Sequence, residues 1–358
     1  MIESPTAEPP RVAGLSGLTV LARGGYATVF RAIQDSVDRE VAIKIENRTL
    51  ETERDQRRFL REARASGRMS SHPHVVDLID VGVTQDGHPY LIMELCRGSY
   101  ADRMKLGPLE AREVRDVGVK IADALVDSHA LGVLHRDVKP ANILYTRFGE
   151  PALADFGLAI LSEFRDVSIT LDVLTPAYAP PEMFKSGTQP TGAVDVYGLA
   201  SSLYAMLRGF PARWPSDRTP TVTTLMEMFE QPIPDLWAVP KDFTATLRAA
   251  MANDPTSRPS AARFRDSLSA LVIPDGRPAP PPGFASRRGP ADMTEQPDPT
   301  QRHSHDEMDS GPAVPDRRAS SGSVSRSDGS TEERESPTRT RLFSVGAALL
   351  ARLAGRAH

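Results

Sequence analysis

The stretch LHRDVKPANIL, residues 134–144, interrupts an otherwise regular sequence pattern. It places three polar residues, Asp137, Lys139 and Asn142, within six positions of a mostly apolar run that also contains a proline. A surface loop could carry such a combination by chance. The alternative is that the three side chains converge on one substrate. The sequence on either side decides between these two interpretations.

A helical pattern surrounds this stretch. The apolar residues that recur at helical spacing before it are Val114, Val117, Ile121 and Leu125. They predict a core-facing stripe on one long helix. Further helices are expected over 195–207 and 260–271.

The first third of the chain has a different periodicity. Short alternating segments rich in β-branched residues predict strands, and one charged segment predicts a helix. The strands are expected in 18–22, 27–33, 40–46, 75–83 and 90–95, and the helix over 51–69. Asp86-Gly87 is a good hairpin turn between the last two strands. A β-rich lobe followed by an α-rich lobe gives an α+β architecture with a cleft between the lobes.

Composition excludes several classes of protein. The 358 residues carry a net charge of −4, so no global basic field attracts nucleic acid. A single cysteine, Cys96, excludes an internal disulfide and a CxxC zinc site. There is no apolar leader in the first residues and no apolar run of the length, about 18 residues, that a membrane span needs. We therefore expect a cytoplasmic protein.

The domain organisation follows from a change in composition near Pro274. Beyond it, proline, serine and charged residues dominate and large apolar residues are scarce, which predicts disorder. The expected segments are a disordered N-terminus (1–14), a folded domain (15–273, with lobes 15–96 and 97–273), a disordered tail (274–340) and a short basic amphipathic segment (341–358). That last segment is too short and interrupted to span a bilayer, and contact with an anionic membrane surface is the less favoured interpretation.

Further motifs occur around the opening stretch in a fixed order. They are a glycine-containing turn in LARGGYATVF, Lys44 in VAIK, Glu62 in FLREARA and Asp155 in ALADFGLAI. With these motifs the sequence resembles the protein kinase family, and within it the bacterial, actinobacterial-like serine/threonine kinases of Hanks type. The resemblance covers about 15–273. It implies a two-lobed fold with a β-rich N-lobe and an α-helical C-lobe, and ATP-dependent phosphorylation of protein Ser/Thr hydroxyls in signal transduction.

The resemblance also implies a role for each polar residue. Because phosphoryl transfer moves a highly charged group, the protein mainly positions it and neutralises charge. Asp137 would accept the proton of the substrate hydroxyl, and Lys139 would lie near the γ-phosphate. Asn142 and Asp155 would hold two Mg²⁺ ions, with Mn²⁺ as an alternative.

Two residues are implied to position these groups. Glu62 would form an ion pair with Lys44, which would contact the α- and β-phosphates of ATP. The hydroxyl of Thr175 would bridge Asp137 and Lys139, as in a serine/threonine kinase.

The nucleotide site is implied by position along the strands and their connection. Its residues would be Ala22, Gly24, Gly25, Val29, Ala42, Lys44, Met93, Glu94, Cys96 and Leu144. For the apolar ones, ordinary core packing is an equally good interpretation. Cys96 is expected to be an inert residue of the connection and not a redox sensor. Ala22 stands where the family pattern has glycine, so we expect a stiffer loop and weaker ATP binding.

The segment TPAYAPPE resembles the peptide-binding segment of protein kinases. Glu182 within it should pair in a bidentate manner with Arg258, and Asp195 should cap the backbone of the loop that holds Asp137. Arg136 precedes that aspartate and is expected to face a phosphate in the span 156–182. The candidates are Ser168 and Thr170, with Asp172 as an acidic alternative that needs no phosphate.

Other functions are weighed against the kinase. A small-molecule phosphotransferase normally lacks the TPAYAPPE segment and is disfavoured. A weakly active kinase or pseudokinase scaffold that recruits partners through its tail is the alternative, supported by Ala22, Ala27 and Leu174. Expected partners are protein substrates and, through a phosphorylated tail, phosphopeptide-binding domains. Ser320 in RRAS is one candidate for modification, although a charged linker is the favoured interpretation there.

Overall fold

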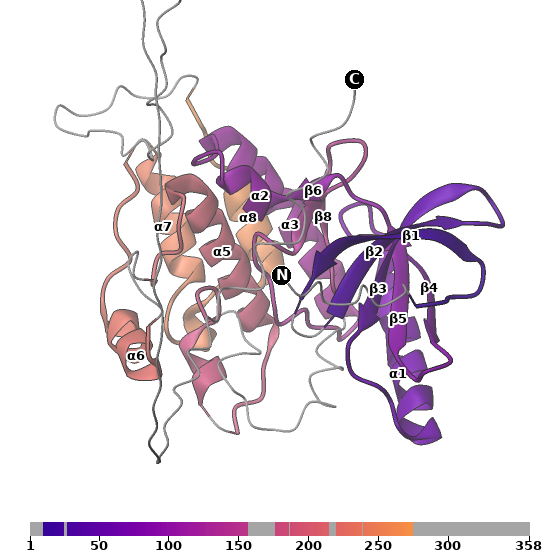
Figure 1. Cartoon of the computed structure of the whole chain (residues 1–358). Coiled ribbons are helices and arrows are strands. Elements are labelled where there is room, and N and C mark those ends of the chain that lie inside the picture. The colour runs from indigo at the N-terminus through magenta and orange to yellow at the C-terminus, as the bar shows by residue number, and fades with distance from the viewer. Residues whose placement is uncertain are drawn as a thin grey trace, which may run out of the picture. The chain divides into compact units, whose positions relative to one another are not determined.

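Strands dominate the chain up to Glu94 and helices dominate from Tyr100 onward (Figure 1). The structure is a computed structural model, and the residues it describes are 10–24, 27–156, 176–185, 187–214, 220–237 and 239–274. The element order confirms the expected α+β class, with a β-rich N-lobe and an α-helical C-lobe. The expected tail and C-terminal segment lie outside the described residues.

Five antiparallel strands form the sheet of the N-lobe in the order β1-β2-β3-β5-β4. They are β1 (Leu15–Arg23), β2 (Ala27–Gln34), β3 (Arg39–Glu46), β4 (Leu78–Val83) and β5 (Pro89–Glu94). Alternation along β3 buries Val41, Ile43 and Ile45 in one apolar cluster. The hairpin between β4 and β5 turns as predicted, and Gly87 supplies a φ of +83°.

The described end of the N-terminal segment, residues 10–14, contacts the sheet, which the expectation of disorder over 1–14 did not include. Val12 is 6% exposed and packs in the same apolar cluster as β3. The N–H of Leu15 donates to the carbonyl oxygen of Val12 at 3.2 Å. A single apolar residue among prolines and charges leaves too weak a compositional signal to predict this packing.

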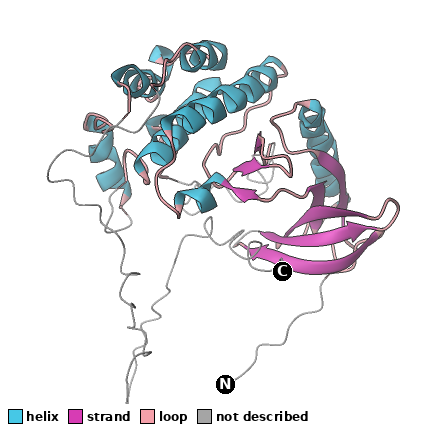
Figure 2. Cartoon of the chain, turned by 90° about the horizontal axis from the view of Figure 1, so that it is seen from above, coloured by secondary structure: helices cyan, strands magenta, loops and turns pink. Residues whose placement is uncertain are grey.

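Helix α1 (Glu53–Ser66) packs on one face of this sheet (Figure 2). It is shorter than the predicted helix at both ends. Oγ1 of Thr52 accepts a hydrogen bond from the N–H of Asp55 at 3.1 Å, so the helix begins directly after Thr52. At the other end, Gly67 opens a 3₁₀ turn, η1 (Gly67–Ser71). Glycine is a poor helix former, which explains the end of α1.

The C-lobe is built from helices and a small sheet. Its helices are α2 (Tyr100–Met104), α3 (Ala111–Ala130), α5 (Gly192–Arg208), α6 (Val222–Glu230), α7 (Lys241–Ala250) and α8 (Ala261–Ser269), with 3₁₀ turns η2 (Pro181–Phe184) and η3 (Pro255–Ser257). The sheet has the order β6 (Gly98–Ser99), β7 (Ile143–Tyr145), β8 (Pro151–Leu153). Strands of two or three residues carry no readable periodicity, so the sequence did not predict them. Among the described helices, none is long and apolar enough to cross a bilayer.

Helices α3 and α5 form the centre of the C-lobe. The predicted stripe of α3 is buried throughout: Val114, Val117, Ile121 and Leu125 are at most 2% exposed. Helix α5 is buried from Val194 to Leu207, as expected for a helix that packs on all sides. Gly118 of α3 permits close packing, because a Cβ there would lie 2.7 Å from Leu203 and 2.9 Å from Leu268. This core fixes the ends of α3 and α5, between which the polar loop is held.

Candidate active site

The loop between α3 and β7 brings Asp137, Lys139 and Asn142 together. Nζ of Lys139 lies 2.7 Å from Oδ2 of Asp137. Nδ2 of Asn142 donates to the backbone oxygen of Asp137 at 2.8 Å and to its Oδ2 at 3.1 Å. The Asp137 side chain is nevertheless 43% exposed, so a substrate can reach it. The convergence of three side chains favours a functional site over a chance combination on a surface loop.

A buried carboxylate at the start of α5 anchors this loop. Asp195 accepts hydrogen bonds from the N–H of His135 at 2.9 Å and from the N–H of Arg136 at 2.6 Å. Arg136 adopts a φ of +64°, a strained conformation for a residue with a side chain. The two charge-assisted hydrogen bonds offset this strain. The predicted capping of the loop by Asp195 is thereby confirmed.

His135 connects the loop to the end of β8. Its Nδ1 accepts a hydrogen bond from the N–H of Asp137 at 3.2 Å. Nε2 must therefore carry the ring proton, and it lies 2.8 Å from the carbonyl oxygen of Ala154. The ring also packs edge-on against Phe156 at 4.9 Å between centroids. One imidazole thus fixes Asp137 relative to the segment that carries Asp155.

Lys44 and Asp155 form an ion pair between the two lobes. Nζ of Lys44, on β3, lies 3.0 Å from Oδ1 of Asp155. Burial by itself would raise the pKa of Asp155, but the charge and the hydrogen bond of Lys44 outweigh it and lower this pKa below its usual value. Asp155 is therefore a carboxylate at neutral pH.

Arg136 carries an unsatisfied group beside this site. Its Nε is buried and has no hydrogen-bond partner among the described residues. A buried guanidinium nitrogen without an acceptor is unfavourable, and an anion would relieve this. The sequence-based candidates for that anion, Ser168, Thr170 and Asp172, lie outside the described residues.

One face of the N-lobe sheet collects the residues expected around the nucleotide. The register places Ala22 opposite Val29, Val29 opposite Lys44, and Ala42 opposite Met93. Paired residues in an antiparallel sheet share a face, as do residues two positions apart on one strand. All five residues therefore lie on the same face.

The connection after β5 completes this apolar wall. Met93, Cys96 and Leu144 belong to one cluster with Val76. Burial, and secondarily the charge of Glu94, raise the pKa of the Cys96 thiol to about 12. The thiol is thus protonated at neutral pH, which supports the expectation of an unreactive residue. Burial also raises the pKa of the Glu94 carboxyl, helped by the negative charge of Asp77.

The turn between β1 and β2 contains the described part of the glycine motif. The N–H of Gly24 donates to the carbonyl oxygen of Ala27 at 2.8 Å. Nδ2 of Asn47, directly after β3, donates to the carbonyl oxygen of Gly24 at 3.1 Å. Ala22 is 4% exposed and lies within the paired part of β1. The altered glycine position is thus inside a strand, and its effect on ATP binding stays a prediction.

A buried ion pair joins Glu182 of η2 to Arg258 and contacts the start of α5 through the carbonyl oxygen of Ala193. Arg258 donates to Glu182 through Nη1 at 2.6 Å and Nη2 at 2.8 Å. The side chains are 0% and 9% exposed, respectively. The guanidinium also lies over the Tyr197 ring, 5.0 Å from its centroid. The predicted bidentate pair is confirmed.

Some predicted site residues fall outside the described part of the chain. These are Gly25, Thr175 and the side chain of Glu62, whose backbone lies in α1. The Lys44–Glu62 pair and the bridge by Thr175 stay predictions, as do the contacts of an adenine ring with the backbone of Glu94 and Cys96.

The sequence did not predict two residues of the site or one contact within it. It paired Lys44 with Glu62 alone, whereas the described partner of Lys44 is Asp155, 111 residues away in sequence. It gave no role to His135 or Asn47. A histidine two residues before the aspartate is visible in the sequence. However, the hydrogen bonds of its two ring nitrogens, to Asp137 and to Ala154, depend on the fold. Asn47 directly follows a predicted strand, where a turn-forming residue is ordinary.

Comparison with known proteins agrees with this geometry. Residues 16–267 match a family model described as "Protein kinase domain". The chain is 39% identical over 254 residues to serine/threonine-protein kinase PknK of Mycobacterium bovis, covering 70% of this chain and 23% of that relative.

Two further relatives show a similar level of identity. Serine/threonine-protein kinase PknH of Mycobacterium tuberculosis is 38% identical over 248 residues, covering 67% of this chain and 38% of that relative. The DNA damage-responsive serine/threonine-protein kinase RqkA of Deinococcus radiodurans is 35% identical over 245 residues, with 66% and 35% covered. The chain thus spans less than half the length of these curated relatives.

Proposed function

This chain belongs to the protein kinase family, and from that premise we propose that it transfers the γ-phosphate of ATP to serine and threonine hydroxyls of proteins. The observation that carries the proposal is that the side chains of Lys139 and Asn142 both lie within hydrogen-bond distance of the Asp137 carboxylate. The lysine two positions after the aspartate is typical of serine/threonine kinases.

Asp137 acts as the proton acceptor in this proposal. The hydroxyl oxygen of the substrate forms a bond to the γ-phosphorus, the bond from that phosphorus to the β–γ bridging oxygen breaks, and ADP leaves. The hydroxyl proton passes to the Asp137 carboxylate. The hydrogen bonds from Asn142 and from Lys139 hold that carboxylate in one orientation, which is the positioning that such a reaction requires.

The two lysines supply positive charge for the phosphates. Lys44 is directed by its strand and by Asp155, and we assign it to the α- and β-phosphates. Lys139, whose side chain is 16% exposed, is assigned to the γ-phosphate. Glu62 on α1 would orient Lys44, and Thr175 would bridge Asp137 and Lys139.

Membership of the family implies use of ATP with a divalent metal ion, and the residues present fit such an ion. Nδ2 of Asn142 donates a hydrogen bond to Asp137, so the amide oxygen of Asn142 can serve as a metal ligand. Asp155 is held as a carboxylate. Hard oxygen ligands of this kind suit Mg²⁺, with Mn²⁺ as the alternative, and we assign Asn142 and Asp155 to the metal. When bound, the ion would neutralise charge on the phosphates.

The apolar wall is assigned to the adenine ring. Val29, Ala42 and Leu144 would enclose the base, with Met93 beside it. The backbone of Glu94 and Cys96 would bind the adenine edge, and Ala22, Gly24 and Gly25 would lie near the phosphates. These assignments are supported by the shared face of the sheet and by the apolar cluster.

The proposal also includes regulation of the kinase, its location and its partners. A phosphate on Ser168 or Thr170, added by autophosphorylation, would satisfy Arg136. The kinase would act in signal transduction in the cytoplasm, and a phosphorylated tail would recruit phosphopeptide-binding domains. Membrane contact by 341–358 stays the less favoured alternative. A scaffold without transfer activity is not favoured, since the matched relatives are named serine/threonine-protein kinases.

Transfer of labelled phosphate tests the proposal. Purified protein is incubated with γ-labelled or α-labelled ATP, with Mg²⁺ or Mn²⁺, and a generic acceptor protein. We expect label from the γ position alone, on phosphoserine and phosphothreonine, and none with Lys44→Ala. Absence of transfer with both metals, or label on tyrosine alone, would contradict the proposal.

A further inference from the structure

Helix α1 carries a stripe of arginines. Arg54, Arg57, Arg61 and Arg64 follow one another at spacings of three and four residues, so their Cα atoms lie along one side of the helix, although the Arg57 side chain turns towards Glu53. All four are exposed. The buried residues of α1, Phe59 and Ala63, face the sheet on the opposite side. We call these four residues the arginine stripe.

The arrangement is unfavourable for the helix by itself. Arginines at i,i+3 and i,i+4 repel one another, and Arg54 in the first turn opposes the helix dipole, although Arg64 in the last turn is favoured by it. An ordinary solvated face would alternate acidic and basic residues. Within the stripe, the described acidic partner is Glu53, which lies 3.1 Å from Arg57 in an exposed pair. A helix that keeps this many like charges on one side is suited to an anionic ligand.

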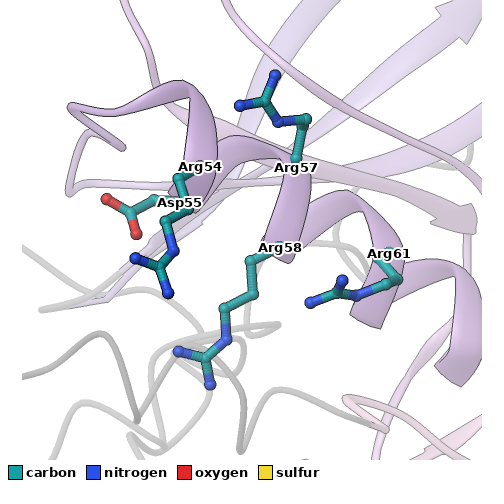
Figure 3. A pocket seen from close by; sticks show the side chains of 5 residues that line it. All are labelled: Arg54, Asp55, Arg57, Arg58 and Arg61. Carbon is teal, nitrogen blue, oxygen red and sulfur yellow. The ribbon is translucent and has the colours of Figure 1, made fainter.

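The surface around the stripe is hollowed. A hollow of about 600 Å³ is lined by Arg54, Asp55, Arg57, Arg58 and Arg61. Figure 3 shows that Arg58 and Arg61 extend to the same side of α1, whereas Arg57 points to another side. A second hollow of about 360 Å³ shares Arg57 and Arg61 and adds Leu60, Arg64 and Arg68. The two hollows are therefore neighbours along the helix and share two of its arginines.

The carboxylate in the first hollow does not cancel this charge. Asp55 accepts a hydrogen bond from Oγ1 of Thr52 at 2.6 Å as part of the start of α1. Its negative charge also favours the helix N-terminus. The guanidinium groups of the stripe can each bind a carboxylate in a bidentate manner.

We propose that the arginine stripe is a docking site for a short segment, rich in aspartate and glutamate, of the proteins that this kinase phosphorylates. The proposal rests on the proposed function and names a class of substrate for it. From Arg54 to Arg64 the stripe is about 15 Å long, from the rise of an α-helix. An extended peptide of about five residues covers that length and presents its alternate side chains to one side.

The observations favour an acidic peptide over nucleic acid. A length of about 15 Å spans about four base pairs of DNA, too few for the phosphate contacts on which such binding depends. None of the described residues that line the two hollows is aromatic, so they offer no platform for stacked bases.

Docking is tested first by binding alone. The full chain with Asp137→Asn, which is expected to transfer no phosphate, is titrated into a labelled ten-residue peptide with aspartate or glutamate at alternate positions. Fluorescence anisotropy gives the Kd. We expect saturable binding that weakens with salt, and none for the same peptide with asparagine and glutamine. Absence of binding by the acidic peptide, or tighter binding of a single-stranded DNA of equal charge, would overturn the proposal.

Charge-matched variants locate the site. Arg54→Gln, Arg61→Gln and Arg64→Gln are combined in one variant, since glutamine is a good helix former. The control combines Arg11→Gln, Arg39→Gln and Arg263→Gln, three exposed arginines outside α1. We expect at least about tenfold weaker binding in the first variant and at most about a twofold change in the control. Equal loss in both would overturn the site. The corresponding triple lysine variant retains the charge and should lose less binding.

A kinetic measurement connects docking to phosphorylation. Two substrate peptides share one phosphoacceptor sequence, and one of them carries the acidic segment on a flexible linker. With active kinase, we expect a lower KM for the linked peptide at unchanged kcat, and loss of that difference in the arginine-stripe variant. Equal KM values in the unmutated kinase would contradict substrate docking. If neither peptide is phosphorylated, the proposed function fails, while the binding result still reports on the site by itself.

Discussion

The N-lobe sheet and the Asp137 loop position their functional side chains by different means. In the sheet, Lys44, Val29 and Met93 share a face because strand register aligns them. In the loop, backbone conformation is irregular, and Asp195 and His135 hold it through individual hydrogen bonds. Many backbone hydrogen bonds together hold the side chains of the sheet in place, whereas the conformation of the loop depends on a few buried polar groups.

This difference has an energetic consequence. A backbone ladder tolerates the loss of one exposed side chain. A buried polar anchor does not, because its removal leaves the partner groups without hydrogen bonds. Substitutions of comparable polar residues should therefore be mild in the sheet and severe around the loop.

The largest expected effect concerns the buried Glu182–Arg258 pair. Glu182→Ala should lower the free energy of unfolding by about 3–5 kcal/mol, because it leaves the buried Arg258 charge uncompensated. Glu40→Ala, which breaks the exposed Arg31–Glu40 pair on the sheet, should change it by at most about 1 kcal/mol. Urea unfolding of both variants measures the contrast, and equal destabilisation would contradict it.

Removal of the loop anchor should have an effect on stability of comparable size. In Asp195→Ala the N–H groups of His135 and Arg136 lose their acceptors, which should cost about 1–3 kcal/mol for each. Phosphate transfer should fall by about 100-fold, because the backbone of the catalytic loop is no longer fixed. Thermal unfolding and initial rates measure both effects.

A surface carboxylate provides the control for that variant. Asp116→Ala removes an exposed partner of Arg115 on α3 and should leave the transfer rate unchanged. A similar rate loss in both variants would show that the loop does not depend on Asp195.

The same difference explains what the sequence could predict. Strand positions, the α3 stripe and the Glu182–Arg258 pair follow from periodicity or from the family resemblance, and the structure confirms them. The proximity of Lys44 and Asp155 and the ring proton on Nε2 of His135 depend on segments far apart in sequence. No local pattern encodes such contacts. The burial of Val12 involves a single residue, and strands β6 to β8 have two or three residues each. Segments this short show no periodicity from which they could be predicted.

A pH dependence is expected at Cys96. Its pKa of about 12 in the folded state exceeds the value of about 8.5 for an unfolded thiol. The folded state therefore retains this proton longer, so the contribution to stability is complete below about pH 8.5 and is lost as pH rises towards 12. At pH 8, iodoacetamide should modify the folded protein at least about 100-fold more slowly than the urea-unfolded protein. Equal rates would contradict the assigned burial.

The smallest effect is expected at Ala22. Ala22→Gly should lower the KM for ATP by about two- to threefold if the alanine stiffens the glycine turn. Because Ala22 is paired in β1, the same change should cost about 0.5–1 kcal/mol of stability. Steady-state kinetics and thermal unfolding separate the two effects. An unchanged or higher KM would remove the reason to regard the turn as impaired.

The central claim, that Asp137 accepts the proton in a site otherwise built to hold ATP, is tested most directly by Asp137→Asn. The substitution retains the size of the side chain and removes its negative charge. Single-turnover transfer from labelled ATP, measured beside equilibrium binding of ATP, separates chemistry from binding. We predict loss of transfer by at least about 1,000-fold with the Kd for ATP changed by at most about threefold. Transfer at close to the rate of the unmutated protein would contradict the account.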